Sequence, residues 1–120
     1  MKLTEKQIDL LNRRKIVVLA TSDLRLRSRA VFVEVNQAKD DQIIITDNLM
    51  VATRKNLLEN NQIALLSFEK DYSYCLKILG AAKYYTEGDY FDLVKSLETN
   101  KKQSPKGAIV ITIKEIIEFK

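Results

Sequence analysis

Apolar residues along this chain occur in short runs separated by polar segments, and the spacing within the runs alternates between that of strands and that of helices. Runs near 15–22, 42–46 and 63–68 are almost continuously apolar, which is typical of buried strands. Residues 28–35 instead alternate, with Ala30, Phe32 and Glu34 on one face and three valines on the other. Together with two longer runs, the pattern predicts six strands: residues 15–22, 28–35, 42–46, 63–68, 74–86 and 108–119.

Three segments have helical spacing. Thr4 and Gln7 form a capping box that starts a helix, which we expect to end near Arg13 or Arg14 because basic side chains suit a helix C-terminus. A short amphipathic helix follows the strand at 42–46, within the polar segment 47–60. A third helix is predicted over 90–97, where residues 91, 94 and 97 form one apolar stripe.

Short connections between neighbouring strands indicate an antiparallel arrangement. The turn at 23–27 lacks glycine and proline, residues 36–41 are predicted to be a polar loop, and Gly80 is expected to mark a bulge in the long fifth strand. About six curved strands can close a small barrel. The valines at 31, 33 and 35 are expected to lie uncovered on such a sheet, so that a two-fold partner would bury them.

Length and composition agree with one domain over residues 1–120. Hydrophobic residues make up 46% and charged residues 30% of the chain, without an apolar run of about 20 residues that would cross a membrane. The N-terminus is charged, which argues against a secretory signal. Cys75 is the single cysteine and excludes an internal disulfide. We therefore expect a cytoplasmic protein that does not enter the membrane.

The residue types that are absent restrict the possible chemistry. The chain has no histidine, which excludes Ser-His and Cys-His nucleophile pairs and histidine metal sites, and it has no CxxC pair, so we expect no metal. The net charge of +4, from 20 basic and 16 acidic residues, is compatible with an anionic ligand but too small to indicate nucleic acid by itself. An enzyme of this composition would use a cofactor.

The segment from Thr46 to Asn60 is the best candidate for a cofactor site. A buried strand leads into a polar turn and then into a short helix, whose start offers backbone N–H groups and hydroxyls. Arg54 and Lys55 follow within two turns. N–H groups, hydroxyls and cations at a helix start are suited to a phosphate, so we predict a phosphorylated cofactor.

The order and spacing of several segments are similar to those of the FMN-binding split-barrel family related to pyridoxamine 5'-phosphate oxidase, in its short single-domain form. The resemblance covers nearly the whole chain, and no one motif within it is sharp. It lies in residues 18–23, 29–34, 41–47, 78–82 and 110–117, and in Met50, Thr53, Asn56, Leu57, Glu59 and Asn60.

The resemblance implies a mainly-β fold with a few helices: a split β-barrel of about six antiparallel strands with Greek-key connections. Similar proteins are homodimers that hold FMN in two clefts at the subunit interface. The strand arginine near the phosphate corresponds to Arg29, and the helix threonine that contacts the phosphate corresponds to Thr53. The strand end whose backbone borders the flavin ring corresponds to Thr46, Asp47 and Asn48. The asparagine that follows the helix threonine corresponds to Asn56.

This chain departs from the family pattern at two places. A Gly-x-Pro sequence is usual in the first hairpin, where this chain has Leu26, Arg27 and Ser28. A lysine usually precedes the helix threonine, where this chain has Ala52. The loss of one charge-assisted hydrogen bond costs about 1.5–3 kcal/mol. The cations that are candidates to replace the lysine are Arg54, Arg27 and Lys55.

Three functions fit these features. The leading interpretation is a homodimeric FMN-binding oxidoreductase in which the flavin transfers hydride or electrons to or from a small-molecule substrate. The second is a flavin carrier or redox sensor without enzymatic activity, because no side chain is an evident general acid or base. The third and least favoured is a nucleic-acid-binding barrel, which is based on the net charge and the basic ridge from Arg25 to Arg29. Arg25 and Arg27 could also form a basic surface with Lys101, Lys102 and Lys106, but scattered charge that keeps the protein in solution is the preferred interpretation.

Overall fold

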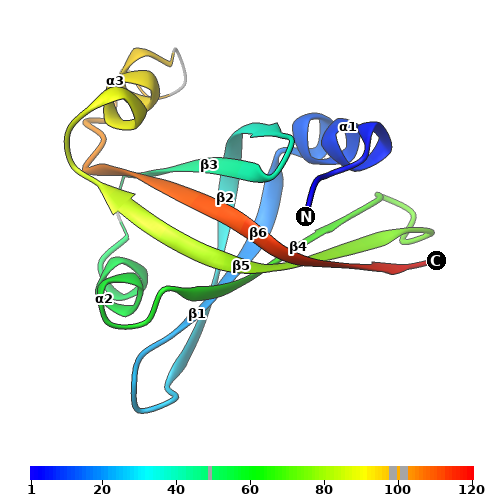
Figure 1. The fold of residues 1–120 in the computed structure, drawn as a ribbon, viewed down its shortest axis with the longest axis horizontal. Coiled ribbons are helices and arrows are strands. Elements are labelled where there is room, and N and C mark those ends of the chain that lie inside the picture. Colours follow the sequence, from blue (N-terminus) through cyan, green and yellow to red (C-terminus); the bar gives the residue numbers. More distant parts are fainter. Residues whose placement is uncertain (49, 98–99, 101–102) are drawn as a thin grey trace.

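The three predicted helices and six predicted strands are all present, in the predicted order, in a computed structural model that describes residues 1–48, 50–97, 100 and 103–120 (Figure 1). Strand ends differ from the predicted ones by at most one residue, except in the second strand. The elements are α1 (Glu5–Arg14), β1 (Ile16–Ser22), β2 (Ser28–Lys39), β3 (Gln42–Asp47), α2 (Ala52–Glu59), β4 (Gln62–Phe68), β5 (Cys75–Tyr85), α3 (Asp89–Ser96) and β6 (Gly107–Phe119).

The six strands form a closed antiparallel barrel in the order β1-β2-β3-β6-β5-β4. The mainly-β barrel expected from the sequence is therefore confirmed. Gly80 lies where the β5–β6 register shifts, as predicted, and a Cβ at this position would lie 2.5 Å from the backbone oxygen of Thr112. Only glycine permits this close approach of the two strands.

The barrel interior is filled by aliphatic side chains from all the strands, and helices α1 and α2 pack against it. Leu10 and Leu11 of α1 cover one end, and Leu57 of α2 joins the same core. The capping box of α1 is present, with Gln7 N donating to Thr4 Oγ1 at 3.2 Å. A second, smaller cluster lies outside the barrel, where Ile44 of β3 packs near Val94 of α3. Because β3 is covered on both faces, its sequence is continuously apolar rather than alternating.

Strand β2 differs most from its prediction. It continues to Lys39, so the polar loop predicted at 36–41 is wrong, and the turn contains only residues 40–41. A bulge between Val35 and Gln37 lets the polar residues pair with β3. The expectation of an uncovered valine face is also wrong, because Val33 and Val35 are buried in this chain's own core. It is Phe32, on the opposite face, that is 76% exposed.

The β1–β2 turn at 23–27 is built without glycine. Asp23 accepts backbone N–H groups of Arg25 and Arg27, at 2.9 and 3.0 Å, and pairs with the Arg27 side chain at 2.7 Å. Leu26 takes the left-handed conformation at φ 64°, which a glycine would normally supply. These backbone bonds and the Arg27 side chain lower the pKa of Asp23.

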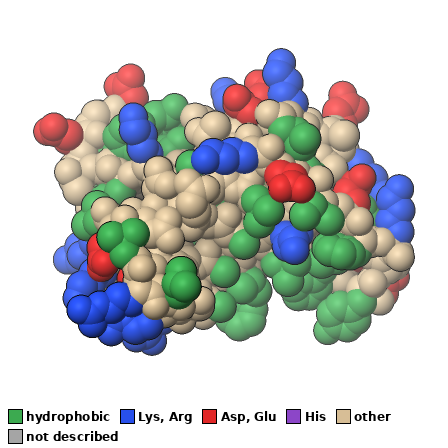
Figure 2. All heavy atoms as spheres, turned by 60° about the horizontal axis from the view of Figure 1, so that its bottom comes forward, with side chains coloured by type: hydrophobic (Ala, Val, Ile, Leu, Met, Phe, Trp, Pro, Cys, Tyr) green, Lys and Arg blue, Asp and Glu red, His purple; other side chains and the backbone are tan. Residues whose placement is uncertain are grey.

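Several large hydrophobic side chains lie at the surface. Figure 2 shows hydrophobic groups along the lower edge of one face, apart from a gathering of Lys and Arg side chains at its lower left. The described helices include none that is both long enough and apolar enough to span a bilayer. The exposed large hydrophobic residues are Met1, Ile16, Leu24, Leu26, Phe32, Val51, Leu58, Tyr72 and Phe119.

Candidate functional site

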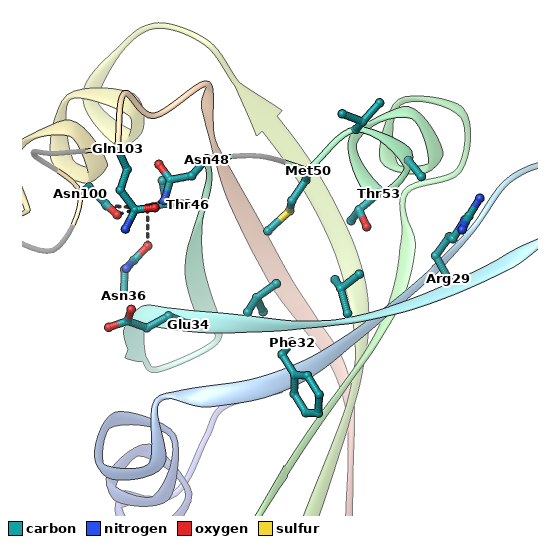
Figure 3. A pocket seen from close by; sticks show the side chains of 14 residues that line it. Arg29, Phe32, Glu34, Asn36, Thr46, Asn48, Met50, Thr53, Asn100 and Gln103 are labelled. Carbon is teal, nitrogen blue, oxygen red and sulfur yellow. Dashed lines mark hydrogen bonds between the residues drawn. The ribbon is translucent and has the colours of Figure 1, made fainter.

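A cavity of about 510 Å³ lies beside the first half of β2, where this strand pairs with β1 but not yet with β3. Pairing of β2 with β3 begins only at Val35, so residues 28–34 of β2 pair with β1 alone. The end of β3, the start of α2 and the segment after α3 form the other walls (Figure 3). The lining residues are Arg29, Val31, Phe32, Val33, Glu34, Asn36, Thr46, Asn48, Met50, Val51, Ala52, Thr53, Asn100 and Gln103.

One end of the cavity is suited to an anion. Arg29 is the cation among the described lining residues and has no ion-pair partner within the described part of the chain. Thr53 lies across from it, near the start of α2 (Figure 3). The N-cap Val51 gives α2 no side-chain cap, so first-turn N–H groups are left for another acceptor. A phosphate at this end would meet a guanidinium, a hydroxyl and a helix N-terminus.

Ala52 lines the same end of the cavity, so the position of the family's lysine is at the site but carries no charge. Two of the candidate replacements are engaged elsewhere. Arg54 pairs with Asp47 at 2.6 Å, and Arg27 pairs with Asp23 at 2.7 Å in the hairpin turn. Lys55 is exposed on α2 and does not line the cavity. Arg29 therefore carries the positive charge at this site without help from these three.

Asp47, one of the predicted ring neighbours, lies behind the cavity wall rather than in it. Its carboxylate is fully buried and accepts the Met50 backbone N–H at 2.8 Å, the Arg54 Nε–H at 2.6 Å and the Tyr84 hydroxyl. Hydrogen bonding to the carboxylate raises the pKa of Arg54. Burial, and then the bond to Asp47, raises the pKa of Tyr84 to about 12. These bonds fix the turn between the end of β3 and the start of α2, which forms part of the cavity wall.

Asn56 is likewise buried outside the cavity, where its Nδ2 donates to Thr21 Oγ1 at 3.1 Å. This bond ties α2 to β1.

Of the seven predicted site residues, the fold brings Arg29, Thr46, Asn48 and Thr53 to the cavity. It places Asp47, Arg54 and Asn56 in the layer that supports the wall.

The other end of the cavity is lined by side-chain amides. The bulge in β2 places Asn36 where its Oδ1 accepts the Thr46 hydroxyl at 2.5 Å, and Asn100 Nδ2 donates to Thr46 Oγ1 at 2.8 Å. Asn48 Nδ2 donates to Asn100 Oδ1 at 3.4 Å. Figure 3 shows these residues and Gln103 grouped together, with Met50 between them and Thr53.

Sequence reasoning did not select Asn36, Asn100 or Gln103 as site residues. Asn36 was placed in a loop, and only the bulge explains why it faces β3. Asn100 follows α3, far from β3 in the sequence, so local patterns gave no signal for it. Glu34 is the acidic residue among the described lining residues, and sequence alternation placed it on the same face as Phe32. Phe32 points away from the cavity interior (Figure 3).

The basic ridge considered for nucleic acid is divided by these contacts. Arg27 is paired within its own turn, whereas Arg29 faces the cavity. Lys101 and Lys102, which were grouped with the ridge, lie outside the described residues.

A flavin nucleotide matches the chemistry of the cavity. It needs an anion site for its phosphate, apolar contact for the ring and polar groups for the ring edge, and these are arranged in that order along β2. Arg29 and Thr53 would hold the phosphate, Val31, Val33 and Met50 would contact the ring, and Asn48 would reach its edge. The buried Oδ1 of Asn48 has no hydrogen-bond partner in the described structure, as expected of a group that awaits a ligand.

Two comparisons with known protein sequences identify relatives of this chain. The family model described as pyridoxamine 5'-phosphate oxidase matches residues 3–120. An uncharacterized protein, MJ0282, of Methanocaldococcus jannaschii is 34% identical over 125 residues, which cover 100% of this chain and 83% of that protein.

Two solved structures are similar in fold. HupZ of Group A Streptococcus has a TM-score of 0.84 at 20% identity and covers 98% of this chain and 94% of its own. An FMN-binding protein from Syntrophomonas wolfei has a TM-score of 0.82 at 22% identity and covers 97% of this chain and 85% of its own. At these identities the structures show a shared split barrel.

Proposed function

The chain belongs to the pyridoxamine 5'-phosphate oxidase family, and we propose that it binds FMN in the β2 cavity as a homodimeric flavoprotein that transfers hydride or electrons. The observation that carries the proposal is the order of chemistry along β2. A cation, a hydroxyl and a helix N-terminus lie at one end, apolar side chains lie in the middle, and amides lie at the other end. When bound, the flavin would supply the redox chemistry, while the protein binds and orients it.

The direct test is an absorbance spectrum of freshly purified protein, followed by mass spectrometry of the released ligand. We expect flavin absorbance, or its appearance after FMN is added. Mass spectrometry would separate FMN from FAD or a deazaflavin. A colourless protein that takes up no added FMN would refute the proposal.

A charge-matched pair of variants tests the phosphate end. Arg29→Gln removes the cation that lines the cavity, and we expect the Kd for FMN to rise by about ten-fold or more. Arg25→Gln removes the same charge from the hairpin turn, outside the cavity lining, and should leave the Kd near that of the wild type. Equal Kd values for both variants would show that Arg29 does not contact the phosphate.

The homodimer is supported by exposed apolar groups on the elements that line the cavity. Phe32 is 76% exposed and Val51 is 78% exposed, and both border the cavity. A second copy that packed against these groups would remove their apolar surface from water next to the site. Sedimentation analysis should show a dimer for the wild type and more monomer for Phe32→Ser. Tyr72→Ser is the control, because Tyr72 is 79% exposed in the β4–β5 turn. An unaltered dimer in Phe32→Ser would contradict this part of the proposal.

A flavin carrier or sensor is the second candidate. It is favoured by the few proton-transfer groups in the cavity lining. Among the described lining residues, Glu34 is the one carboxylic acid and there is no tyrosine or cysteine. Mixing the flavin-loaded protein with NADH or NADPH distinguishes the two functions. Rapid bleaching of the flavin supports an oxidoreductase, and a stable spectrum favours the carrier. We place either function in the cytoplasm, as proposed from the lone Cys75.

A further inference from the structure

One backbone carbonyl, that of Val94, determines the orientation of the side-chain amides at the end of the cavity opposite Arg29. Asn100 lies 2.8 Å from the carbonyl oxygen of Val94, which can only accept a hydrogen bond. The atom of Asn100 that faces it must therefore be Nδ2, the donor. The same Nδ2 donates to Thr46 Oγ1 at 2.8 Å, which leaves Asn100 Oδ1 as an acceptor on the other side.

The orientation of the Asn100 amide determines the donors and acceptors of Thr46 and Asn48. Thr46 accepts from Asn100, so its one hydroxyl hydrogen is free to be donated to Asn36 Oδ1 at 2.5 Å. Asn48 faces the Asn100 acceptor at 3.4 Å and must present its own Nδ2 there. The Oδ1 of Asn48 is then the final group of the network. It is buried and has no hydrogen-bond partner in the described structure.

A buried amide oxygen without a donor is unfavourable by about 1–3 kcal/mol, and a ligand that supplies the donor removes this cost. Because the network is anchored on a carbonyl, Asn48 cannot turn its amide over without leaving two acceptors facing each other. We infer that Asn48 selects a ligand with an N–H donor on its ring edge, and that it accepts a hydrogen bond from that group. The inference rests on the proposed function and deepens it: an oxidised flavin carries one such group, the N3–H of its pyrimidine ring.

The test compares FMN with 3-methyl-FMN, which keeps the phosphate and the ring system but replaces the N3 hydrogen with a methyl group. Titrations of the wild-type protein, followed by flavin fluorescence, give a Kd for each. We expect 3-methyl-FMN to bind about 5- to 150-fold more weakly, the range for one unpaired buried polar group. Equal Kd values for the two flavins would overturn the inference.

Substitution of Asn48 shows whether 3-methyl-FMN binds more weakly because a hydrogen bond is lost or because the methyl group is excluded sterically. Asn48→Leu has a similar shape without an acceptor, so we expect it to bind both flavins with nearly equal affinity. Thr53→Val acts at the phosphate end and should weaken both flavins by the same factor.

The outcomes also distinguish this inference from the proposed function. A wild-type protein that binds neither flavin refutes the flavin function itself. A protein that binds both equally refutes only the role of Asn48. Persistence of the preference in an Asn48→Leu protein that is folded by circular dichroism would overturn the inference.

Discussion

Two tyrosine-to-phenylalanine substitutions measure how much a hydrogen bond to the buried carboxylate behind the cavity contributes to the free energy of unfolding. Tyr84 donates its hydroxyl to Asp47, and Tyr74 donates its hydroxyl to Glu118 at another part of the barrel. Burial, and then the bond to the carboxylate, raises the pKa of each tyrosine to about 12. The acceptors differ, because Asp47 is fully buried and Glu118 is exposed. Water can replace the lost bond at Glu118 but not at Asp47.

The expected losses follow from this difference. Tyr84→Phe removes a hydrogen bond to a buried charge, so we expect the free energy of unfolding to fall by about 1.5–3 kcal/mol. For a chain of this size that loss lowers the Tm by about 5–15 °C. Tyr74→Phe removes a bond that solvent can replace, and we expect a loss of about 1 kcal/mol or less.

Urea unfolding followed by far-UV circular dichroism measures both losses, and the wild-type m-value serves as the check that the folded state is intact. Because Asp47 also holds the Met50 N–H, Tyr84→Phe should weaken FMN binding as well, whereas Tyr74→Phe should not. Equal losses of stability in the two variants would refute the reasoning from burial.

Three further predictions concern stability. Because the unfolded phenols ionise near pH 10 and the folded ones near pH 12, the stability contributed by Tyr74 and Tyr84 is fully present below pH 10 and is lost as the pH rises through about 12. Urea midpoints should fall over this interval, and less so in the double phenylalanine variant; an unchanged slope would contradict this. Ser67 is fully buried and its hydroxyl has no partner in the described structure, so Ser67→Ala should leave the urea midpoint unchanged or raise the stability by about 1 kcal/mol. A clear loss would show that the hydroxyl is satisfied in solution. A Cβ on Gly107 would lie 2.5 Å from Tyr84 Cζ, so Gly107→Ala should displace the ring and break its bond to Asp47. Its loss should therefore be less than additive with that of Tyr84→Phe, and full additivity in a double-mutant cycle would count against the displacement.

Local sequence patterns were sufficient for the elements and for part of the site. The order of helices and strands, the capping box at Thr4 and the bulge at Gly80 were predicted because each depends on residues that are close in the chain. The two residues at the anion end, Arg29 and Thr53, were also selected from the sequence, by resemblance to a family. The extent of β2 was predicted wrongly, because its polar second half pairs with β3 through a bulge that alternation does not reveal.

The sequence by itself determined six strands, three helices and a candidate phosphate end, since periodicity and capping act within a few residues. Only the tertiary structure decided which polar groups meet. It turned Arg54 toward the buried Asp47 rather than toward the cavity, and it brought Asn100 to Thr46 from 54 positions away. The direction of a side chain and a contact between distant segments depend on how the barrel closes, and no local pattern of residues contains that information.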